Sequence, residues 1–97
     1  MPISFDQKVS VTPDTLINIV GEESVLLNLK SESYYGLDEV GTRMWTALTT
    51  SDSIEAAYEM LLAEYDISAE VLQQDLQGLL ENLIQHALVS VGNGSVA

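Results

Sequence analysis

The stretch SYYGLDEVGTRMW, residues 33–45, changes from the pattern of a β-strand to the pattern of an α-helix. Two tyrosines with strong strand preference lie in a short run from Ser33 to Leu37. Asp38 follows as a helix N-cap, and apolar residues then recur at spacings of three and four, which is typical of a helix with one buried face. The order of the two patterns predicts an α+β fold, with a β part followed by an α part within one domain.

Three strands are predicted before this point. The apolar runs 16–20 and 24–30 are separated by a polar loop of hairpin length that begins with Gly21. A second polar turn, at residues 31–33, leads to the short strand that ends at Leu37. We therefore expect an N-terminal three-stranded antiparallel sheet whose short last strand lies at an edge. An earlier alternating run, 8–11, is closed by Pro13, which argues for a turn or an edge position there.

Three helices are predicted after the sheet. The first extends from about Glu39 to Leu48, the second ends at about Glu64, and the third runs from Ala69 to about His86. The second helix begins near Asp52, which lies three residues before Glu55 in the arrangement of a capping box, and Ser68 is placed to cap the third helix.

The helical spacing also predicts which side chains form the core. The expected buried faces are Leu37, Val40, Met44 and Leu48 with Trp45 beside them, then Ile54, Ala57, Tyr58, Leu61, Leu62 and Tyr65, and finally Leu72, Leu76, Leu80, Leu83 and Ala87. Residues 87–91 are predicted to leave the third helix as a short extended segment. Residues 1–91 then form a single domain, and residues 92–97 form a disordered tail.

Composition excludes several classes of function. The chain has 97 residues, of which 46% are hydrophobic, enough for one modest core. Three Lys and Arg oppose 15 Asp and Glu, a net charge of −12, so few cations are present to bind a phosphate backbone and a nucleic-acid binder is excluded. The absence of cysteine excludes disulfides and a zinc ribbon, and suits a reducing cytoplasm, where we expect the protein. Neither a signal peptide nor a membrane-spanning segment is predicted, so we expect no membrane partner.

The chain offers little material for catalysis. It has one histidine, no cysteine and no glycine-rich phosphate motif, so we predict that it is not an enzyme and that it holds no metal and no cofactor. His86 lies near the end of the third helix, where an imidazole interacts favourably with the helix dipole. The acid pairs at 22–23 and 38–39 occupy a turn and a helix start, where solvated and capping carboxylates are usual.

The distribution of charge and of apolar residues favours binding instead. No Lys or Arg follows Arg43, so the helical half carries charge of a single sign that attracts cationic partners, or that serves solubility alone. At 100° per residue, one flank of the third helix presents Val71, Asp75, Leu79, Asn82 and His86. Its apolar members either extend the core under a neighbouring element or line a groove. Beside an edge strand at 33–37, such a groove has the geometry for peptide capture by β-augmentation.

Residues 25–29 and 34–45 resemble the strand–turn–strand–helix signature of the PqqD family. The segments 53–55, 64–67, 71–75, 79–83 and 88–89 are similar to the remaining helices and closing segment of that family. The resemblance covers nearly the whole chain, from about residue 11 to 91. Within the family, the most similar variant is the free-standing leader-binding protein of lasso peptide gene clusters.

The resemblance implies a winged helix-turn-helix-like fold and a non-catalytic function as a RiPP recognition element. Such a protein captures the leader segment of a ribosomally made precursor, here of a lasso peptide, as an added strand between the third strand and the third helix. The peptide-binding positions that carry over are Ser33, Tyr34, Tyr35, Leu37, Val71, Leu72, Asp75, Leu79 and Asn82. The implied partners are the precursor leader, a separately encoded transglutaminase-like leader peptidase, and a macrolactam-forming cyclase that acts afterwards.

Two alternatives remain open from the sequence. Acyl or peptidyl carrier proteins are also small and acidic, and the triplet at 52–54 resembles their phosphopantetheine attachment site, with Ser53 as the modified residue. Carrier proteins are all-helical, whereas about 30 residues of β pattern precede Ser53 here. The other alternative is a domain that regulates another protein or oligomerises through its exposed strand.

Overall fold

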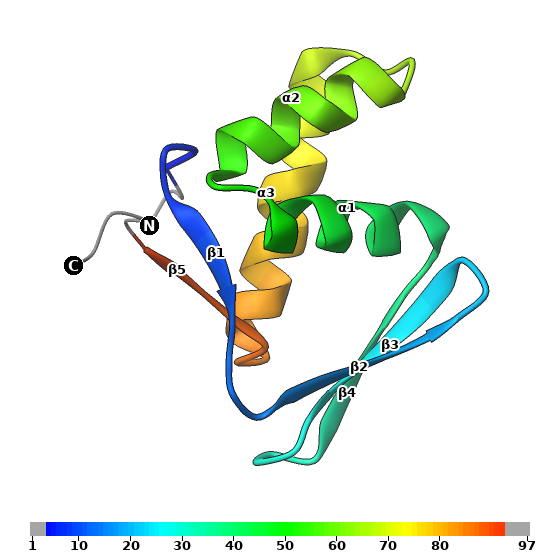
Figure 1. Cartoon of the computed structure of the whole chain (residues 1–97), viewed down its shortest axis with the longest axis vertical. Helices are drawn as coiled ribbons and strands as arrows, with labels where there is room; N and C mark the ends of the chain where they lie inside the picture. The colour runs from blue at the N-terminus through cyan, green and yellow to red at the C-terminus, as the bar shows by residue number, and fades with distance from the viewer. Residues whose placement is uncertain (1–3, 93–97) are drawn as a thin grey trace.

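The computed structural model describes residues 4–92 as an α+β fold in which three helices pack against two small sheets (Figure 1). The strands are β1 (Lys8–Val11), β2 (Thr15–Val20), β3 (Glu23–Asn28), β4 (Ser33–Leu37) and β5 (Val89–Gly92). The helices are α1 (Glu39–Thr50), α2 (Ile54–Glu64) and α3 (Ala69–Gln85). The predicted fold class and the order of the elements are confirmed.

The larger sheet is antiparallel and has the strand order β2-β3-β4. Val20 pairs with Glu23 across a two-residue turn, and Gly21 supplies the positive φ of 65° that this turn needs. β4 pairs with β3 from Leu37 opposite Ser24 to Ser33 opposite Asn28. Within residues 4–92 no strand pairs with the other side of β4, so the predicted edge position is confirmed.

The second sheet was not predicted. β1 and β5 pair antiparallel, from Lys8 opposite Gly92 to Val11 opposite Val89. Local patterns identify two short extended runs but carry no signal that joins segments so far apart in the chain. Gly92, which the sequence analysis assigns to the tail, is instead the last residue of β5. The rest of the predicted tail, residues 93–97, lies outside the described residues.

Two of the three predicted helix caps are confirmed, and the third is displaced by one residue. Asp38 caps α1 and Ser68 caps α3 through their side-chain oxygens. At α2 the cap is Ser53 and not Asp52, with Ser53 Oγ accepting from the Ala56 amide at 3.1 Å. No helix in the described part of the chain has both the length and the apolarity needed to cross a membrane.

The start of α2 is fixed by the segment that precedes β1. The amides of Ile54 and Glu55 donate to the carbonyls of Gln7 and Phe5, each at 2.8 Å. These bonds satisfy two amides that a helix leaves without internal partners at its N-terminus. The helix therefore begins at Ile54, and Ser53 is the residue left in the capping position.

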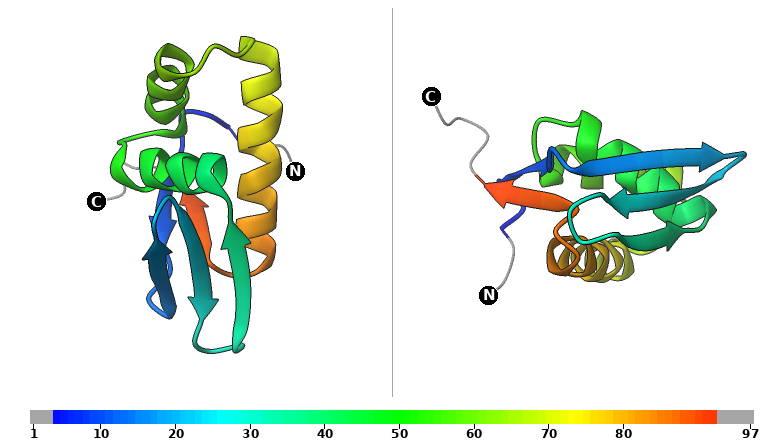
Figure 2. Two further views of the ribbon diagram at one scale, coloured as in Figure 1. Left: turned by 90° about the vertical axis from the view of Figure 1, so that its right-hand side faces the viewer. Right: turned by 90° about the horizontal axis from the view of Figure 1, so that it is seen from below.

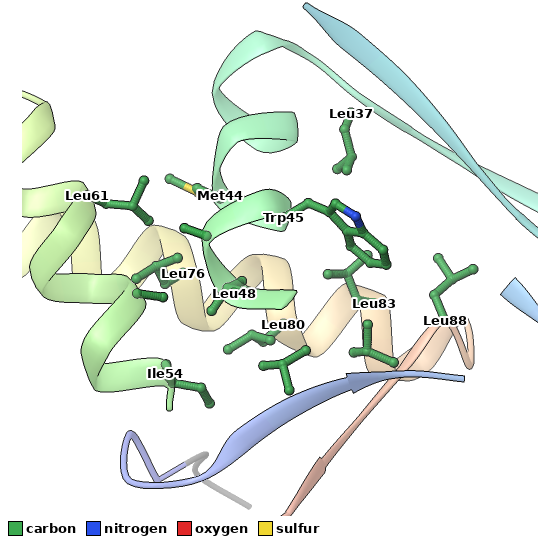
Figure 3. Packing of buried hydrophobic residues seen from close by; sticks show 14 of the residues in the cluster. Leu37, Met44, Trp45, Leu48, Ile54, Leu61, Leu76, Leu80, Leu83 and Leu88 are labelled. Carbon is green, nitrogen blue, oxygen red and sulfur yellow. The ribbon is translucent and has the colours of Figure 1, made fainter. Parts of the chain in front are cut away.

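The core lies where the three helices meet β3, β4 and the β1–β5 ribbon (Figure 3). Trp45 is 5% exposed, and the predicted leucines of α3 are fully buried. Two core predictions are wrong. Val40 is 45% exposed because it lies on the outer side of the first turn of α1. Ala87 is exposed because α3 has already ended, and its φ of 57° is that of a residue terminating a helix. Tyr58, Leu62 and Tyr65 are only half-buried at the edge of the core.

One ion pair joins α1 to α2 and makes stability depend on pH. Arg43 Nε and Nη2 donate to the two carboxylate oxygens of Glu64, each at 2.7 Å, and these hydrogen bonds lower the pKa of Glu64. A lowered folded-state pKa means that the pair stabilises the fold above the ordinary glutamate pKa and loses this effect as the pH falls through the folded-state value. We therefore expect Glu64→Gln to lower the urea midpoint slightly at neutral pH and to lower it less as the pH falls below the ordinary glutamate pKa. Glu59→Gln, an exposed acid on the same helix, is the matched control, and an equal effect above and below that pKa would contradict the expectation.

Candidate functional site: a groove beside an edge strand

A groove of about 450 Å³ lies between the free edge of β4, the start of α1 and the flank of α3. Figure 2 shows β4 running alongside α3, with β2 at the opposite edge of the sheet. The residues that line the groove are Tyr35, Gly36, Leu37, Asp38, Val40, Gly41, Met44, Asp75 and Leu79.

The backbone of β4 presents unpaired groups toward this groove. The two-residue turn between β2 and β3 is closed by the hydrogen-bonded pair Val20–Glu23, and bonded and non-bonded pairs alternate along an antiparallel ladder. Residues 23, 25 and 27 of β3 therefore direct their backbone groups to β2, and residues 24, 26 and 28 direct theirs to β4. Tyr35 and Leu37 are opposite Leu26 and Ser24 and use their backbone groups inside the sheet. Tyr34 and Gly36 are left with amides and carbonyls that point away from the sheet, available to an added strand.

The end of the groove nearest the β3–β4 loop is held in place by a buried asparagine. Asn28 is 3% exposed, and its Nδ2 donates to the carbonyls of His86 and Ala87 at 3.2 and 3.0 Å. Its Oδ1 accepts from the amides of Lys30 and Ser31 in the β3–β4 loop. One side chain thus ties the C-terminus of α3 to the hairpin that carries β4. The rings of Tyr35 and His86 meet at 5.2 Å between centroids and close the same end.

The other end of the groove, nearest the start of α1, is held in place by a contact between β3 and α1. Ser24 Oγ and Thr42 Oγ1 lie 2.8 Å apart in a buried hydrogen bond. Gly41 allows α1 to start close to β4, because a Cβ at this position would lie 3.2 Å from Leu37 Cδ2. Side-chain contacts therefore link β4 and its neighbours to the helices at both ends of the groove.

The lining combines apolar and acidic side chains. Val40, Met44 and Leu79 supply apolar surface, while Asp38 and Asp75 supply carboxylates from α1 and α3. Asp38 Oδ1 is already engaged by the Gly41 amide at 2.8 Å, whereas Asp75 is exposed on the α3 flank. An extended peptide with an apolar side chain and a cationic side chain matches this lining.

The structure brings four of the nine predicted site residues into the groove lining, namely Tyr35, Leu37, Asp75 and Leu79. Ser33 is half-buried at the start of β4. Val71 and Asn82 are exposed on α3, on the N-terminal and C-terminal sides of Asp75. Tyr34 is 74% exposed, on the opposite face of the sheet from Tyr35. Leu72 is 1% exposed, so it belongs to the core behind the groove and not to the groove surface.

Five lining residues were not predicted from the sequence: Gly36, Asp38, Val40, Gly41 and Met44. Four of them belong to the cap and first turns of α1, which directly follow β4 in the chain. That adjacency is a usable signal, because the first turn of a helix that directly follows an edge strand lies near that end of the strand. Helical periodicity instead assigned Val40 and Met44 to the core alone.

The family model described as coenzyme PQQ synthesis protein D (PqqD) matches residues 23–89. The chain belongs to the PqqD family. Residues 23–89 include β4, α1 and α3, which are the elements that line the groove. No curated protein matches this PqqD-family chain.

Two solved structures are similar to this PqqD-family chain. The first, "TbiB1 in Complex with the TbiA(beta) Leader Peptide", is 27% identical with a TM-score of 0.75, and the match covers 91% of this chain and 98% of that chain. The second, "Lasso peptide synthetase B1 complexed with the leader peptide", is 18% identical with a TM-score of 0.73, covering 86% and 98% of the two chains. At 18% identity the second likeness shows the fold alone.

Proposed function

We propose that this PqqD-family protein is a non-catalytic adaptor that captures the leader peptide of a ribosomally made precursor, as an added strand on β4. The observation that carries the proposal is the free edge of β4, whose Tyr34 and Gly36 backbone groups face a preformed groove closed by α3. Backbone pairing supplies affinity in this mode of recognition, and side-chain pockets supply specificity. The similar structure at 27% identity is a complex with a leader peptide, which supports the same function here.

The groove chemistry suggests how a leader would be oriented. Main-chain bonds to Tyr34 and Gly36 place the side chains of the added strand alternately toward the groove and toward the outer face of the sheet. A side chain pointing into the groove meets Leu79 and Met44, and a cationic side chain two residues along the strand also points into the groove and meets Asp75. The Ser33, Val71 and Asn82 positions extend the same strip beyond the groove ends.

The direct test is an NMR titration of labelled protein with a synthetic leader peptide taken from the small open reading frame beside its gene. We expect amide shifts at residues 33–37 and along 71–82, and unmoved amides along β2. Shifts confined to β2, or no shifts at all, would refute leader capture at β4.

Asp75→Lys is expected to lower the affinity for a leader that carries a basic residue by about tenfold, because an attractive charge pair in a partly open groove becomes a repulsive one. The loss should shrink as salt is raised, since the site is exposed to solvent. Calorimetric titration at two salt concentrations measures both effects. Glu81→Lys makes the same change in net charge on the same helix outside the groove, so an equal loss in that variant would mean that only overall charge matters.

We further propose that capture serves separately encoded enzymes: a transglutaminase-like leader peptidase first, and a macrolactam-forming cyclase on the released core peptide. This step rests on the resemblance to the leader-binding proteins of lasso peptide clusters. The rate at which the separately encoded peptidase cleaves the leader should rise when this protein is added. Cleavage at the same rate without it would remove the peptidase from the proposal.

No observation favours the carrier-protein alternative. Ser53 Oγ is engaged as the N-cap of α2, and four strands precede it, whereas carrier proteins are all-helical. A mass increase on Ser53 after incubation with a phosphopantetheinyl transferase and coenzyme A would restore that alternative.

A further inference from the structure

The outer face of the β2-β3-β4 sheet is apolar and uncovered. The register places Leu16, Leu27 and Tyr34 in one cross-strand row and Val25 beside Gly36 in another, all on this face. Leu26 and Leu37, on the opposite face, are buried against the helices. On the outer face Leu16 is 54% exposed and Tyr34 is 74% exposed. The face is therefore an apolar surface to which the described helices contribute no cover.

A hollow of about 330 Å³ lies at one end of this face. It is lined by Val20, Glu23, Ser24, Val25, Gly36, Leu37 and Asp38, where β3 begins and β4 ends. The hollow exists because Gly36 has no side chain opposite Val25, and a Cβ built at Gly36 would meet nothing within 4 Å. Val25 is 40% exposed and Val20 is 68% exposed, so the apolar walls of the hollow are accessible to a side chain from another molecule.

Carboxylates stand at the rim of the hollow. Glu23 and Asp38 are exposed at its edge, and Glu22 lies next to Glu23 in the turn. An apolar pocket with an acidic rim suits an arginine or lysine side chain, whose aliphatic stem packs on the valines while its charged head reaches the carboxylates.

A second copy of this chain fits the face poorly. The chain carries 15 acids and three basic residues, and Arg43 is already bound by Glu64. Two outer faces brought together would place their acidic rims against each other, which is unfavourable. The charge therefore selects a partner that is basic where it meets the rim.

We propose that the outer face of the sheet is a docking surface for a second protein that presents apolar side chains around an arginine or lysine, with the cationic side chain seated in the Gly36 hollow. The hollow shares Gly36, Leu37 and Asp38 with the leader groove, but its valine walls lie on the outer face of the sheet and the rest of the groove lies on the α3 side of β4. The inference therefore does not rest on leader capture.

The test uses two synthetic peptides, one of alternating leucine and arginine and one of alternating leucine and glutamate. Each is titrated without leader into labelled protein and, in parallel, into its Asp75→Lys variant, because the wild-type groove also suits an extended peptide with apolar and cationic side chains. We expect the arginine peptide to shift the amides of Val20 and Val25 to the same extent in both proteins, with any shift at Leu79 lost in the Asp75→Lys variant, and the glutamate peptide to shift none of them. Val25→Lys should lower the affinity of the hollow for the arginine peptide by about tenfold, through like-charge repulsion and lost apolar contact. Ile84→Lys is the matched control, because Ile84 is also 40% exposed but lies on α3 outside the hollow.

Three results would overturn the proposal: no binding of the arginine peptide, shifts at Asp75 and Leu79 instead of the hollow, or equal weakening by Val25→Lys and Ile84→Lys. A dimer measured by light scattering that Val25→Lys dissociates would assign the face to a second copy. Val20→Lys, at the most exposed wall of the hollow, repeats the experiment if Val25→Lys fails to fold. Loss of leader binding with intact binding of the arginine peptide would contradict the proposed function alone.

Discussion

Tyr34→Pro is expected to lower the affinity for the leader peptide by about 30- to 100-fold while the protein stays folded. Proline has no amide hydrogen, and its ring occupies the space into which the Tyr34 amide points. An added strand loses a main-chain hydrogen bond there and must also move away, which together cost about 2 to 3 kcal/mol. The fold should persist because the lost amide faces away from β3 and proline is tolerated on such edges.

Ile19→Pro is the matched control for this experiment. By the same alternation, Ile19 of β2 directs its amide away from β3, but at the opposite edge of the sheet. Both variants therefore remove one outward-facing amide from an edge strand, and only one of the two edges adjoins the groove. Calorimetric titration should show normal leader binding by Ile19→Pro, and normal binding by a folded Tyr34→Pro variant would contradict strand addition on β4.

Leu76→Ala is expected to lower the free energy of unfolding by about 2 to 5 kcal/mol, a large part of the roughly 5 to 15 kcal/mol typical of a domain. Leu76 is fully buried in the middle of α3, between α1 and α2, so truncation leaves a cavity that the packed helices cannot close (Figure 3). Urea unfolding followed by the fluorescence of Trp45, the only tryptophan, measures the loss.

Leu79→Ala provides the contrast on the same helix. Leu79 is half-buried and lines the groove, so its truncation should cost about 1 kcal/mol or less of stability and should weaken leader binding. A larger loss of stability from Leu79→Ala than from Leu76→Ala would mean that the core and the groove have been assigned to the wrong faces of α3.

Much of the fold could be predicted because its signals are local. The turn at Gly21, the caps at Asp38 and Ser68 and the leucine spacing of α3 each act within a few residues, and each has the predicted structure. The β1–β5 pairing could not be predicted, because nothing near Lys8 indicates that its partner is Gly92. The cap of α2 shifted from Asp52 to Ser53 for the same reason, since the bonds that fix it come from Phe5 and Gln7.

The groove was predictable in outline, and its detail was not. An edge strand and a helix flank that mixes apolar and polar residues can both be recognised in the sequence, and the structure places Tyr35, Asp75 and Leu79 around the groove. Which backbone groups of β4 are free depends on the ladder register, which the turn at Gly21 sets only once the pairing partners are known. Leu72 belongs to the buried stripe that helical spacing predicts, and only the family resemblance put it among the site residues; it is 1% exposed.

The β1–β5 ribbon also determines how this domain could be joined to other proteins. Lys8 and Gly92 face each other at its open end, so the outer ends of the first and last strands meet there, on the far side of the molecule from β4 (Figure 1). A domain whose ends meet in this way can be placed within a surface loop of a host protein without stretching the host. Grafted into the loop of an unrelated enzyme, it would bring its groove as a self-contained recruitment module facing away from the host.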